Sequence, residues 1–294
     1  MLLEFIADSK SLAIVSHTTP DLDTLCAASS IQDLIPNIES FLVCKDMIPQ
    51  RMQKLFPNHK WKLEIPAHVK EIIAIDCSNW QRTGLPENSS YKILNFDHHQ
   101  TNTNFGEFNY IIKSASSTCE MLADIIRIYG IKIQAHTAQK LLNGIYDDTK
   151  CLQTPSTTSK TLKACKFLQQ HGANPLIASQ TTKPKLTYRK LKNLGNTLRK
   201  TYVNQHGIAI CKQKGDHKRD HLDLIIDLVD QIPRKKVSAL FTRNHKGLVR
   251  ASLRNNKTEY DMTQIAKPFG GGGHKRAAGF IASKETIDQQ QLFN

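Results

Sequence analysis

Long hydrophobic runs are missing from this sequence: no stretch of its 294 residues is apolar and long enough to span a bilayer. The start of the chain does not resemble a secretory signal, because Glu4 and Asp8 interrupt its apolar stretch. The seven cysteines form no CxxC pair and have no regular spacing, which argues against a structural zinc site and a disulfide framework. We therefore expect a cytoplasmic protein with reduced thiols.

Positive charge, by contrast, is plentiful: the formal net charge is +14 and the pI is near 9.4. A basic balance favours polyanionic partners such as nucleotides or nucleic acid. A solvated basic surface that only keeps the protein in solution is the alternative, and charge alone does not separate the two. The length suffices for two compact domains, and a hydrophobic content of 39% is ordinary for a globular protein.

Short apolar runs alternate with helix-period segments in the first half of the chain. Strands are predicted at 12–16, 40–44, 71–75 and 91–95, and helices at about 23–34, 117–129, 135–146 and 158–171. The strand segments are almost continuously apolar, as is typical of parallel strands buried on both faces. We predict an α/β protein of two domains, the larger being an N-terminal parallel-sheet domain over residues 1–180.

The composition shifts near Gln180, where a segment rich in Lys, Thr and Asn begins. Residues 181–200 are predicted to form a linker that runs into a basic helix, and residues 201–294 a smaller C-terminal α/β domain. Strands are predicted there at 207–212, 236–242 and 248–254, with a helix at about 220–230. A glycine run, residues 270–273, directly precedes His274. Glycines let backbone N–H groups approach a phosphate closely, although such a run can equally form a tight turn.

Acidic and histidine side chains gather at the ends of predicted elements in the larger domain. The carboxyl ends of parallel strands share one edge of a sheet, so these side chains can converge there. Taken singly, an Asp before a helix is usually a cap, and the other clusters can be turns or exposed loops. The candidates are His17, Asp21 and Asp23 after the first strand, Asp76 after the third, Asp97, His98 and His99 after the fourth, and Asp147 and Asp148 at a helix end.

Taken together, these side chains form a mixed set of carboxylates and imidazoles. Such a set suits manganese, magnesium or iron better than a closed zinc site. Two metal ions about 3.5–4 Å apart share a carboxylate, and Asp76 is the candidate because its strand is central. A strand would point His98 and His99 to opposite faces, so we expect one as a ligand and the other facing the substrate. The acidic pair Asp147 and Asp148 opposes the helix dipole, so positive charge is expected nearby.

At these residues the sequence resembles the DHH phosphoesterase superfamily. The resemblance is carried by His17-x3-Asp21-x-Asp23, Asp76, Asp97-His98-His99-x2-Asn102 and Gly144-Ile145-x2-Asp148-Thr149, which match its four motifs in order and spacing. Ser252-Leu253-Arg254 and the segment from Gly270 to Gly279 resemble the small domain that accompanies the DHH domain in one subgroup. The resemblance covers nearly the whole chain and is greatest to the stand-alone nanoRNase and pAp phosphatase group.

The resemblance implies a role for each candidate residue. It implies that one metal ion is held by His17, Asp21 and Asp76, and a second by Asp23, Asp76, His98 and Asp148. It implies that His99 touches the scissile phosphate and helps the leaving oxygen depart, while Asp97 orients the histidines. It also implies that the second domain grips the nucleotide, with the active site in the cleft between the domains, through Arg254, Gly271, Gly272, Gly273 and His274.

The implied reaction is metal-dependent hydrolysis of phosphodiester or terminal phosphate bonds in short nucleotides, such as linear dinucleotides, short RNA and pAp. Two divalent ions, with manganese as the expected metal, are the implied cofactors. A cyclic-dinucleotide phosphodiesterase is the alternative among enzymes, and a non-catalytic basic RNA-binding protein is the alternative outside them. Lys150 and Asn255 stand where relatives often carry glycine and serine, which bears on substrate preference. No membrane association and no obligate protein partner are expected, and a homodimer is left open.

Overall fold

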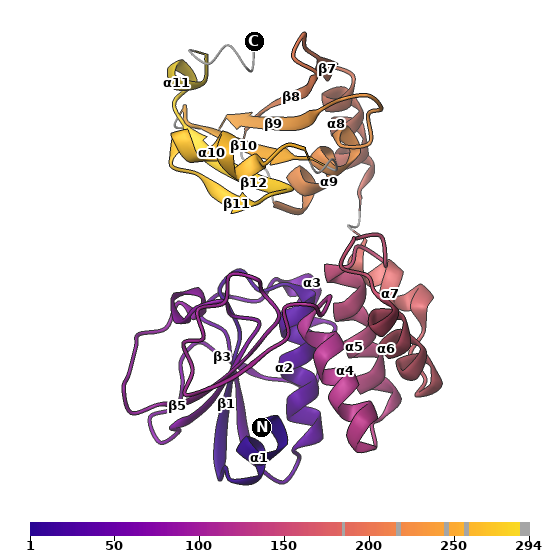
Figure 1. Ribbon diagram of the computed structural model, residues 1–294. Helices are drawn as coiled ribbons and strands as arrows, with labels where there is room; N and C mark the ends of the chain where they lie inside the picture. Colours follow the sequence, from indigo (N-terminus) through magenta and orange to yellow (C-terminus); the bar gives the residue numbers. More distant parts are fainter. Residues whose placement is uncertain (184–185, 216–218, 244–246, 256–258, 289–294) are drawn as a thin grey trace. The chain divides into compact units, whose positions relative to one another are not determined.

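A computed structural model describes residues 1–183, 186–215, 219–243, 247–255 and 259–288, apart from the side chains of Arg51, Arg219, Asp220, His274, Lys284 and Asp288. The chain divides into two compact units, Met1–Lys183 and Pro184–Asn294 (Figure 1). Each unit has its own sheet and its own hydrophobic core. Among the described residues, none of the helices combines the length and the apolar character needed to cross a bilayer.

The first unit is a parallel sheet with most of its helices packed along one face (Figure 1). Its elements in chain order are α1 (Leu2–Ala7), β1 (Ser11–Val15), α2 (Leu22–Leu34), β2 (Glu39–Val43), α3 (Gln50–Gln53), β3 (Trp61–Lys62), β4 (Glu71–Ile75), η1 (Trp80–Thr83), β5 (Lys92–Asp97), β6 (Phe108–Ile111), α4 (Thr118–Tyr129), α5 (Ala135–Asp148), α6 (Ser159–Gln170) and α7 (Pro175–Thr182).

Both faces of this sheet are buried, which explains the near-continuous apolar runs of its central strands. On β1, Leu12 and Ile14 belong to the core beneath the helices. Ala13 and Val15 point the other way, into a smaller core that also contains Trp80 of η1. Successive side chains of a strand alternate between faces, so a strand covered on both sides needs apolar residues at every position.

The second unit is a mixed sheet in the order β11-β12-β10-β9-β8-β7, in which β8 and β9 pair parallel and the other neighbours pair antiparallel. Its elements are α8 (Tyr188–Leu198), β7 (Tyr202–Val203), β8 (Ile208–Lys214), α9 (Arg219–Val229), β9 (Val237–Arg243), β10 (Val249–Arg254), α10 (Met262–Ala266), η2 (Lys267–Phe269), β11 (Gly272–His274), β12 (Ala277–Ala282) and α11 (Lys284–Asp288). Helices α8 and α9 pack on one face of this sheet, and α10 packs on the other.

The predicted α/β fold, with a parallel N-terminal sheet and a smaller C-terminal α/β unit, is confirmed. Two details of the prediction are wrong. The helix expected to end at Tyr146 continues to Asp148, so both acids belong to its last turn. The glycine run is not a loop throughout, because β11 begins at Gly272 and pairs with β12. The functional division into 1–180, 181–200 and 201–294, and the cleft between the domains, stay predictions.

Candidate metal centre

The connectivity of the first sheet brings several polar side chains to one edge. The strand order is β3-β2-β1-β4-β5-β6, so the chain runs outward from β1 and then returns to β4 on the other side of β1. Ligands of open α/β sheets bind beyond the carboxyl ends of the strands at such a reversal. His17 follows β1, Asp76 follows β4, and Asp97 ends β5. The three side chains therefore lie where this fold offers a binding site.

Asp76 leaves β4 in a conformation that few residue types adopt. Its φ is 59°, in the left-handed region where Asp and Asn are enriched among the residues other than glycine. Its N–H still donates to the carbonyl oxygen of Phe96, at 3.0 Å. Backbone strain of this kind persists where the surrounding structure holds it, and it clusters at functional sites. The conformation directs the Asp76 carboxylate between His17 and His98.

Asp76 offers one carboxylate oxygen to each of two groups of side chains. Its Oδ2 lies 3.4 Å from the Nε2 of His17, which lies 3.6 Å from the Oδ2 of Asp21. Its Oδ1 lies 3.4 Å from the Nε2 of His98, which lies 3.2 Å from the Oδ2 of Asp148. The structure thus brings these five side chains together at the end of the sheet, with Asp76 between the two groups.

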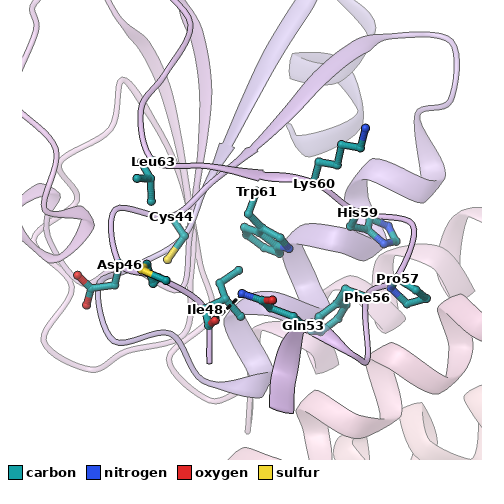
Figure 2. A pocket seen from close by; sticks show the side chains of 11 residues that line it. Cys44, Asp46, Ile48, Gln53, Phe56, Pro57, His59, Lys60, Trp61 and Leu63 are labelled. Carbon is teal, nitrogen blue, oxygen red and sulfur yellow. Dashed lines mark hydrogen bonds between the residues drawn. The ribbon is translucent and has the colours of Figure 1, made fainter. Parts of the chain in front are cut away.

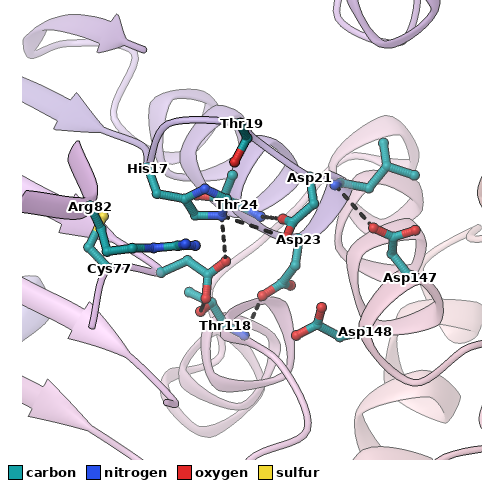
Figure 3. A network of polar contacts seen from close by, with 12 residues as sticks. His17, Thr19, Asp21, Asp23, Thr24, Cys77, Arg82, Thr118, Asp147 and Asp148 are labelled. Atoms are coloured by element: carbon teal, nitrogen blue, oxygen red, sulfur yellow. Dashed lines mark hydrogen bonds and ion pairs between the residues drawn. The ribbon is translucent and has the colours of Figure 1, made fainter. Parts of the chain in front are cut away.

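Asp23 joins the second group from the first turn of α2. Its carboxylate is fully buried and accepts hydrogen bonds from the backbone N–H groups of Thr118 (2.7 Å) and Cys119 (3.0 Å), where α4 begins (Figure 3). The positive end of the α4 dipole favours this negative charge. Asp23, His98 and Asp148 each offer one ligand atom, and these atoms all lie within 4.8 Å of one another. The six predicted ligand residues are therefore gathered in one place.

Asp21 is both a helix cap and a candidate metal ligand. It is the N-cap of α2, and its Oδ1 accepts the N–H of Thr24 at 3.1 Å. Its other oxygen, Oδ2, faces His17. The cap interpretation of this aspartate is therefore correct, but it leaves the second oxygen available to a metal ion.

Two buried nitrogens show that the cluster fits metal ions. The Nε2 atoms of His17 and His98 have no hydrogen-bond partner, although each faces carboxylate oxygens at 3.2–3.6 Å. Two atoms that each bind one ion at about 2.1 Å are about 3.0–3.4 Å apart for octahedral or tetrahedral angles. Imidazole nitrogens and carboxylate oxygens at these spacings can hold a divalent ion in each group.

His98 and His99 do not point to opposite faces of the sheet. Because β5 ends at Asp97, strand alternation does not extend to the two histidines. Their ring centroids are 4.8 Å apart, and both rings approach Oδ1 of Asp76, at 3.4 Å for His98 and 3.5 Å for His99. The prediction of opposite faces is therefore wrong, and the two rings differ in their other partners instead.

The Asp97 carboxylate holds one histidine of the pair. Its Oδ1 lies 2.7 Å from Nδ1 of His99, and its Oδ2 accepts a 2.5 Å hydrogen bond from the side-chain amide of Asn102. The Nδ1 of His98 instead lies 3.3 Å from the carbonyl oxygen of Ala115. The expectation that Asp97 orients both histidines is therefore wrong for His98. Asp97 is fully buried, so its contact with His99 is protected from water.

The electrostatics of the cluster reflect crowded negative charge. Burial, and then the charge of Asp76, raise the pKa of Asp23 to about 6. Burial, and then the charge of Asp23, raise the pKa of Asp148 well above its ordinary value. Burial alone would lower the pKa values of His17 and His98, but contacts with the facing carboxylates outweigh it and raise them to about 11 and about 12. In the absence of metal, protonated histidines therefore balance the acids.

Two side chains of the site, Thr118 and Arg82, were not singled out from the sequence. Thr118 donates from its Oγ1 to Oδ1 of Asp76 at 3.2 Å. Asp147, which was predicted together with Asp148, accepts the N–H of Leu22 at 3.2 Å. Figure 3 shows Arg82 of η1 extending toward the cluster. Thr118 directly follows the helix cap Ser117, a local signal that could have placed it at a helix start but not beside Asp76.

Gly144 allows α5 to reach the cluster. A Cβ atom at this position would lie 2.3 Å from the Sγ of Cys119 and 2.9 Å from Oδ1 of Asp23, closer than real Cβ contacts. A side chain there would push α5 away from Asp23. The glycine that precedes Asp148 in its motif therefore has a packing reason.

In the second unit, the predicted substrate residue Arg254 ends β10 and is already engaged. Its Nη1 donates to the carbonyl oxygen of Leu253 at 3.1 Å, and its Nη2 lies 3.5 Å from a carboxylate oxygen of Asp223. The Arg254 side chain is 25% exposed, so it can still meet a ligand.

The predicted phosphate-binding glycines are partly explained by packing. A Cβ at Gly271 would lie 2.3 Å from the carbonyl oxygen of Gly279, and one at Gly273 would lie 2.4 Å from that of Ala277. A Cβ at Gly272 would meet nothing within 4 Å. The side chain of His274 lies outside the described residues. Nucleotide binding by this segment stays a prediction.

Comparison with known families accounts for both units. The model described as the DHH family, N-terminal domain, matches residues 11–145, and that of the DHHA1 domain matches residues 205–292. The first match contains every candidate metal ligand except Asp148, and the second contains Arg254 and the glycine run.

The relatives include enzymes of different length. The bifunctional oligoribonuclease and PAP phosphatase NrnA of Thermus thermophilus is 24% identical over 94% of this chain and 85% of its own. The cyclic-di-AMP phosphodiesterase GdpP of Geobacillus thermodenitrificans is 27% identical over 99% of this chain and 48% of its own. The chain spans about a third to a half of the length of this and other long relatives.

Among solved structures, an exopolyphosphatase-related protein from Bacteroides fragilis has the same fold. It superposes with a TM-score of 0.87 at 16% identity and covers 99% of this chain and 94% of its own. At this identity the likeness concerns the fold alone.

Proposed function

Since the chain carries the DHH-family N-terminal domain followed by a DHHA1 domain, it belongs to the DHH family, and we propose that it is a two-metal hydrolase of phosphate esters in short nucleotides. The proposed substrates are linear dinucleotides, short RNA and pAp, by likeness to the oligoribonuclease and PAP phosphatase of Thermus thermophilus. The observation that carries the proposal is the Asp76 carboxylate, which presents one oxygen to each of two ligand groups.

The six gathered side chains would hold the two ions. His17, Asp21 and Asp76 would bind one, and Asp23, Asp76, His98 and Asp148 the other. This mixture of carboxylates and imidazoles supports Mn²⁺ as the preferred ion. Ions bound there would activate water for attack on phosphorus and would neutralise charge on the phosphate. We place the reaction in the cytoplasm, and a homodimer remains part of the proposal to be tested by solution mass.

His99 is proposed to protonate the leaving oxygen. Burial alone would lower its pKa, but the contact with Asp97 and the charge of Asp76 raise the pKa above its ordinary value. An imidazolium with its Nδ1 held by Asp97 keeps its Nε2–H available as a proton donor. Asp97 thus acts by orienting His99 and keeping it protonated.

Two arginines are proposed to bind the phosphates. Arg82 is exposed, and its backbone is fixed by a hydrogen bond from its N–H to the side chain of Asn79 (3.0 Å) and one from Thr18 N–H to its carbonyl oxygen (2.7 Å). A guanidinium can bind two oxygens of one phosphate at once. Arg254, with Gly271, Gly272, Gly273 and His274, is proposed to hold the rest of the nucleotide.

Hydrolysis of cyclic dinucleotides is the second candidate reaction. It is supported by the likeness to a cyclic-di-AMP phosphodiesterase, which extends over 99% of this chain. The same metal centre would serve both reactions, since both hydrolyse a phosphate ester bond. The two differ in the substrate that fits the remaining surface.

A substrate panel tests the proposed function. Full-length protein with Mn²⁺ is assayed on linear di- and trinucleotides, a five-nucleotide RNA, pAp and a cyclic dinucleotide, with EDTA as the control. We expect turnover of the linear substrates and pAp, and none in EDTA. Turnover of the cyclic dinucleotide alone would support the second candidate. Metal-independent RNA binding without hydrolysis of any substrate would contradict both reactions and favour a binding protein.

A further inference from the structure

Helices α2 and α5 carry metal ligands at one end and line a cavity farther along. On α2, Asp33 is ten residues beyond Asp23, and on α5, Lys140 is eight residues before Asp148. With a rise of 1.5 Å per residue, the cavity residues lie about 12–15 Å along the helices from the ligands. The cavity beside Asp33 and Lys140, called here the basic cavity, has a volume of about 1000 Å³. A nucleotide-sized ligand fits such a volume.

The walls of the basic cavity carry an excess of positive charge. Their charged and titratable side chains are a single carboxylate against four lysines and two histidines, namely Asp33, Lys54, Lys60, Lys62, Lys140, His59 and His136. The amide side chains of Gln32, Asn58, Gln139 and Asn143 also line it. Such a lining favours an anionic ligand with several hydrogen-bond acceptors.

The one carboxylate, that of Asp33, already pairs with neighbouring cationic side chains. Its Oδ2 lies 2.6 Å from the Nζ of Lys140 and 3.1 Å from the Nε2 of His136, and its Oδ1 lies 3.0 Å from the Nε2 of His59. Lys54 and Lys60 are exposed, and their ammonium groups make no hydrogen bond or ion pair within the described part of the chain. Two positive charges at the cavity therefore lack a counter-charge.

A smaller cavity adjoins the basic cavity and is lined by residues that follow β2. It has a volume of about 460 Å³ and shares three lining residues with the basic cavity, among them His59 and Lys60. At its other end it is lined by Asp46, whose carboxylate accepts the N–H of Thr19 at 2.7 Å. Thr19 is two residues from His17, so the two cavities follow one another away from the metal centre.

The walls of the smaller cavity suit a nucleobase. Figure 2 shows Trp61 and Gln53 beside it, and the ring of the buried Phe56 packs edge-on against that of Trp61, with centroids 6.4 Å apart. The Nε1 of Trp61 and the Nδ1 of His59 are buried and have no hydrogen-bond partner. Aromatic side chains beside a basic groove are the combination with which proteins bind single strands regardless of their sequence.

We propose that the smaller cavity and the basic cavity form a track for a single strand, in which Lys54 and Lys60 bind the phosphates of nucleotides beyond the cleaved bond. The proposal rests on the proposed function, because the metal centre defines where the cleaved bond lies. A dinucleotide with its ester at the metal centre ends before the basic cavity, whereas a longer strand reaches it. The track therefore strengthens the binding of strands of several nucleotides and leaves that of a dinucleotide unchanged.

The test compares the full-length variant K54Q/K60Q with the control K163Q/K166Q. Both remove two exposed lysines of the first unit, but Lys163 and Lys166 lie on α6 and do not line either cavity. Binding of a labelled five-nucleotide RNA and of a labelled dinucleotide is measured in EDTA at several salt concentrations. K54Q/K60Q should weaken binding of the five-nucleotide RNA about tenfold and reduce the slope of log affinity against log salt by about 1.4, since each lost phosphate contact on a single strand accounts for about 0.7. Binding of the dinucleotide, and both ligands with the control, should change less than about twofold.

Three other outcomes would contradict the proposed track or its link to the reaction. Equal weakening of the dinucleotide and the five-nucleotide RNA, or an equal effect of K163Q/K166Q, would mean that the two lysines act only through the overall charge. A matching loss in the binding of free 5′-AMP would show that the cavity takes a separate nucleotide. If the wild type hydrolyses no nucleotide with Mn²⁺, the proposed reaction fails, but the binding comparison still decides whether the cavities hold RNA.

Discussion

Aspartate and histidine side chains are buried at both ends of the α2–α5 helix pair, but the charges around them differ. At the metal end, aspartates outnumber the cations around them. Burial and the neighbouring acids raise the pKa values of Asp23 and Asp148, whereas at Asp76, which faces both histidines, the contacts with these rings outweigh burial and lower the pKa. At the other end, burial would raise the pKa of Asp33, but hydrogen bonds from His59 and Lys140 outweigh it and lower the pKa below its ordinary value. The balance of charges, and not the presence of Asp and His, separates a metal site from an ion pair that stabilises the fold.

This contrast explains why only one end invites a metal ion. Asp33 has its partners within the chain, with Lys140 at 2.6 Å. The aspartates of the metal end have the helix start at Thr118 and the two histidines, and the ring nitrogens of His17 and His98 lack hydrogen bonds. A divalent ion would resolve the mutual repulsion of these acids while binding the orphaned nitrogens.

The strongest test of the contrast is Asp76→Asn. Removing the shared carboxylate should lower kcat by about three orders of magnitude, as loss of a principal catalytic group does. Asparagine tolerates the left-handed backbone of this position, so the variant should still fold. Its melting temperature without metal should fall: burial would raise the pKa of Asp76, but the contacts with His17 and His98 outweigh burial, lower the pKa and stabilise the folded protein. Hydrolysis rates and a melting curve in EDTA measure both effects.

The matched control is Asp124→Asn. Asp124 pairs with Arg127 on the surface of α4, away from the metal ligands. It should leave kcat and melting temperature nearly unchanged. A kcat of Asp76→Asn within tenfold of the wild-type value would contradict the proposal that Asp76 binds both metal ions.

Asp33→Asn should reduce stability and leave catalysis intact. The change leaves Lys140, whose side chain is 7% exposed, buried without its carboxylate. The free energy of unfolding should fall by about 3 kcal/mol, the low end of the cost of breaking a buried pair. Urea denaturation measures the change, and kcat should stay within about twofold of the wild type.

The pH dependence of that loss has a defined sign. Because the pKa of Asp33 is lowered in the folded state, its stabilising effect is fully present above the ordinary aspartate pKa of about 4 and is lost as the pH falls. The difference in stability between wild type and Asp33→Asn should therefore shrink below about pH 4. A difference that stays constant down to pH 2 would contradict the ion-pair account.

The smallest expected effect concerns protons at the metal end. The raised pKa values of His17 and His98 keep both rings protonated at neutral pH without metal, so binding a divalent ion must release protons. The apparent affinity for Mn²⁺ should rise about tenfold per pH unit for each proton released. Calorimetric titration of Mn²⁺ in two buffers of different ionisation enthalpy counts the protons. Binding heats that do not depend on the buffer would argue against this charge balance.

The sequence predicts most of the fold because the buried strands are apolar at nearly every position. Glu71–Ile75 illustrates this, with four of its five residues buried. The two-residue strands β3 and β7 are too short to show any periodicity. The candidate side chains were found because His17, Asp76 and Asp97 lie at the ends of strands that finish at the same edge of the sheet.

Other parts of the site depend on contacts between distant segments. The hydrogen bond from Thr118 to Asp76 joins residues 42 positions apart, and that from Leu22 to Asp147 joins residues 125 positions apart. Neither has a local pattern that could reveal it. The relative orientation of His98 and His99 was misjudged because the end of β5 depends on hydrogen bonds with its neighbouring strands.

The left-handed backbone of Asp76 bears on how the gene can evolve. The residues that suit this conformation, asparagine and glycine, are each one base change from an aspartate codon. A gene copy could therefore lose the shared carboxylate in a single step and still encode a folded protein. Under the proposed function, such a descendant would bind short nucleotides without hydrolysing them.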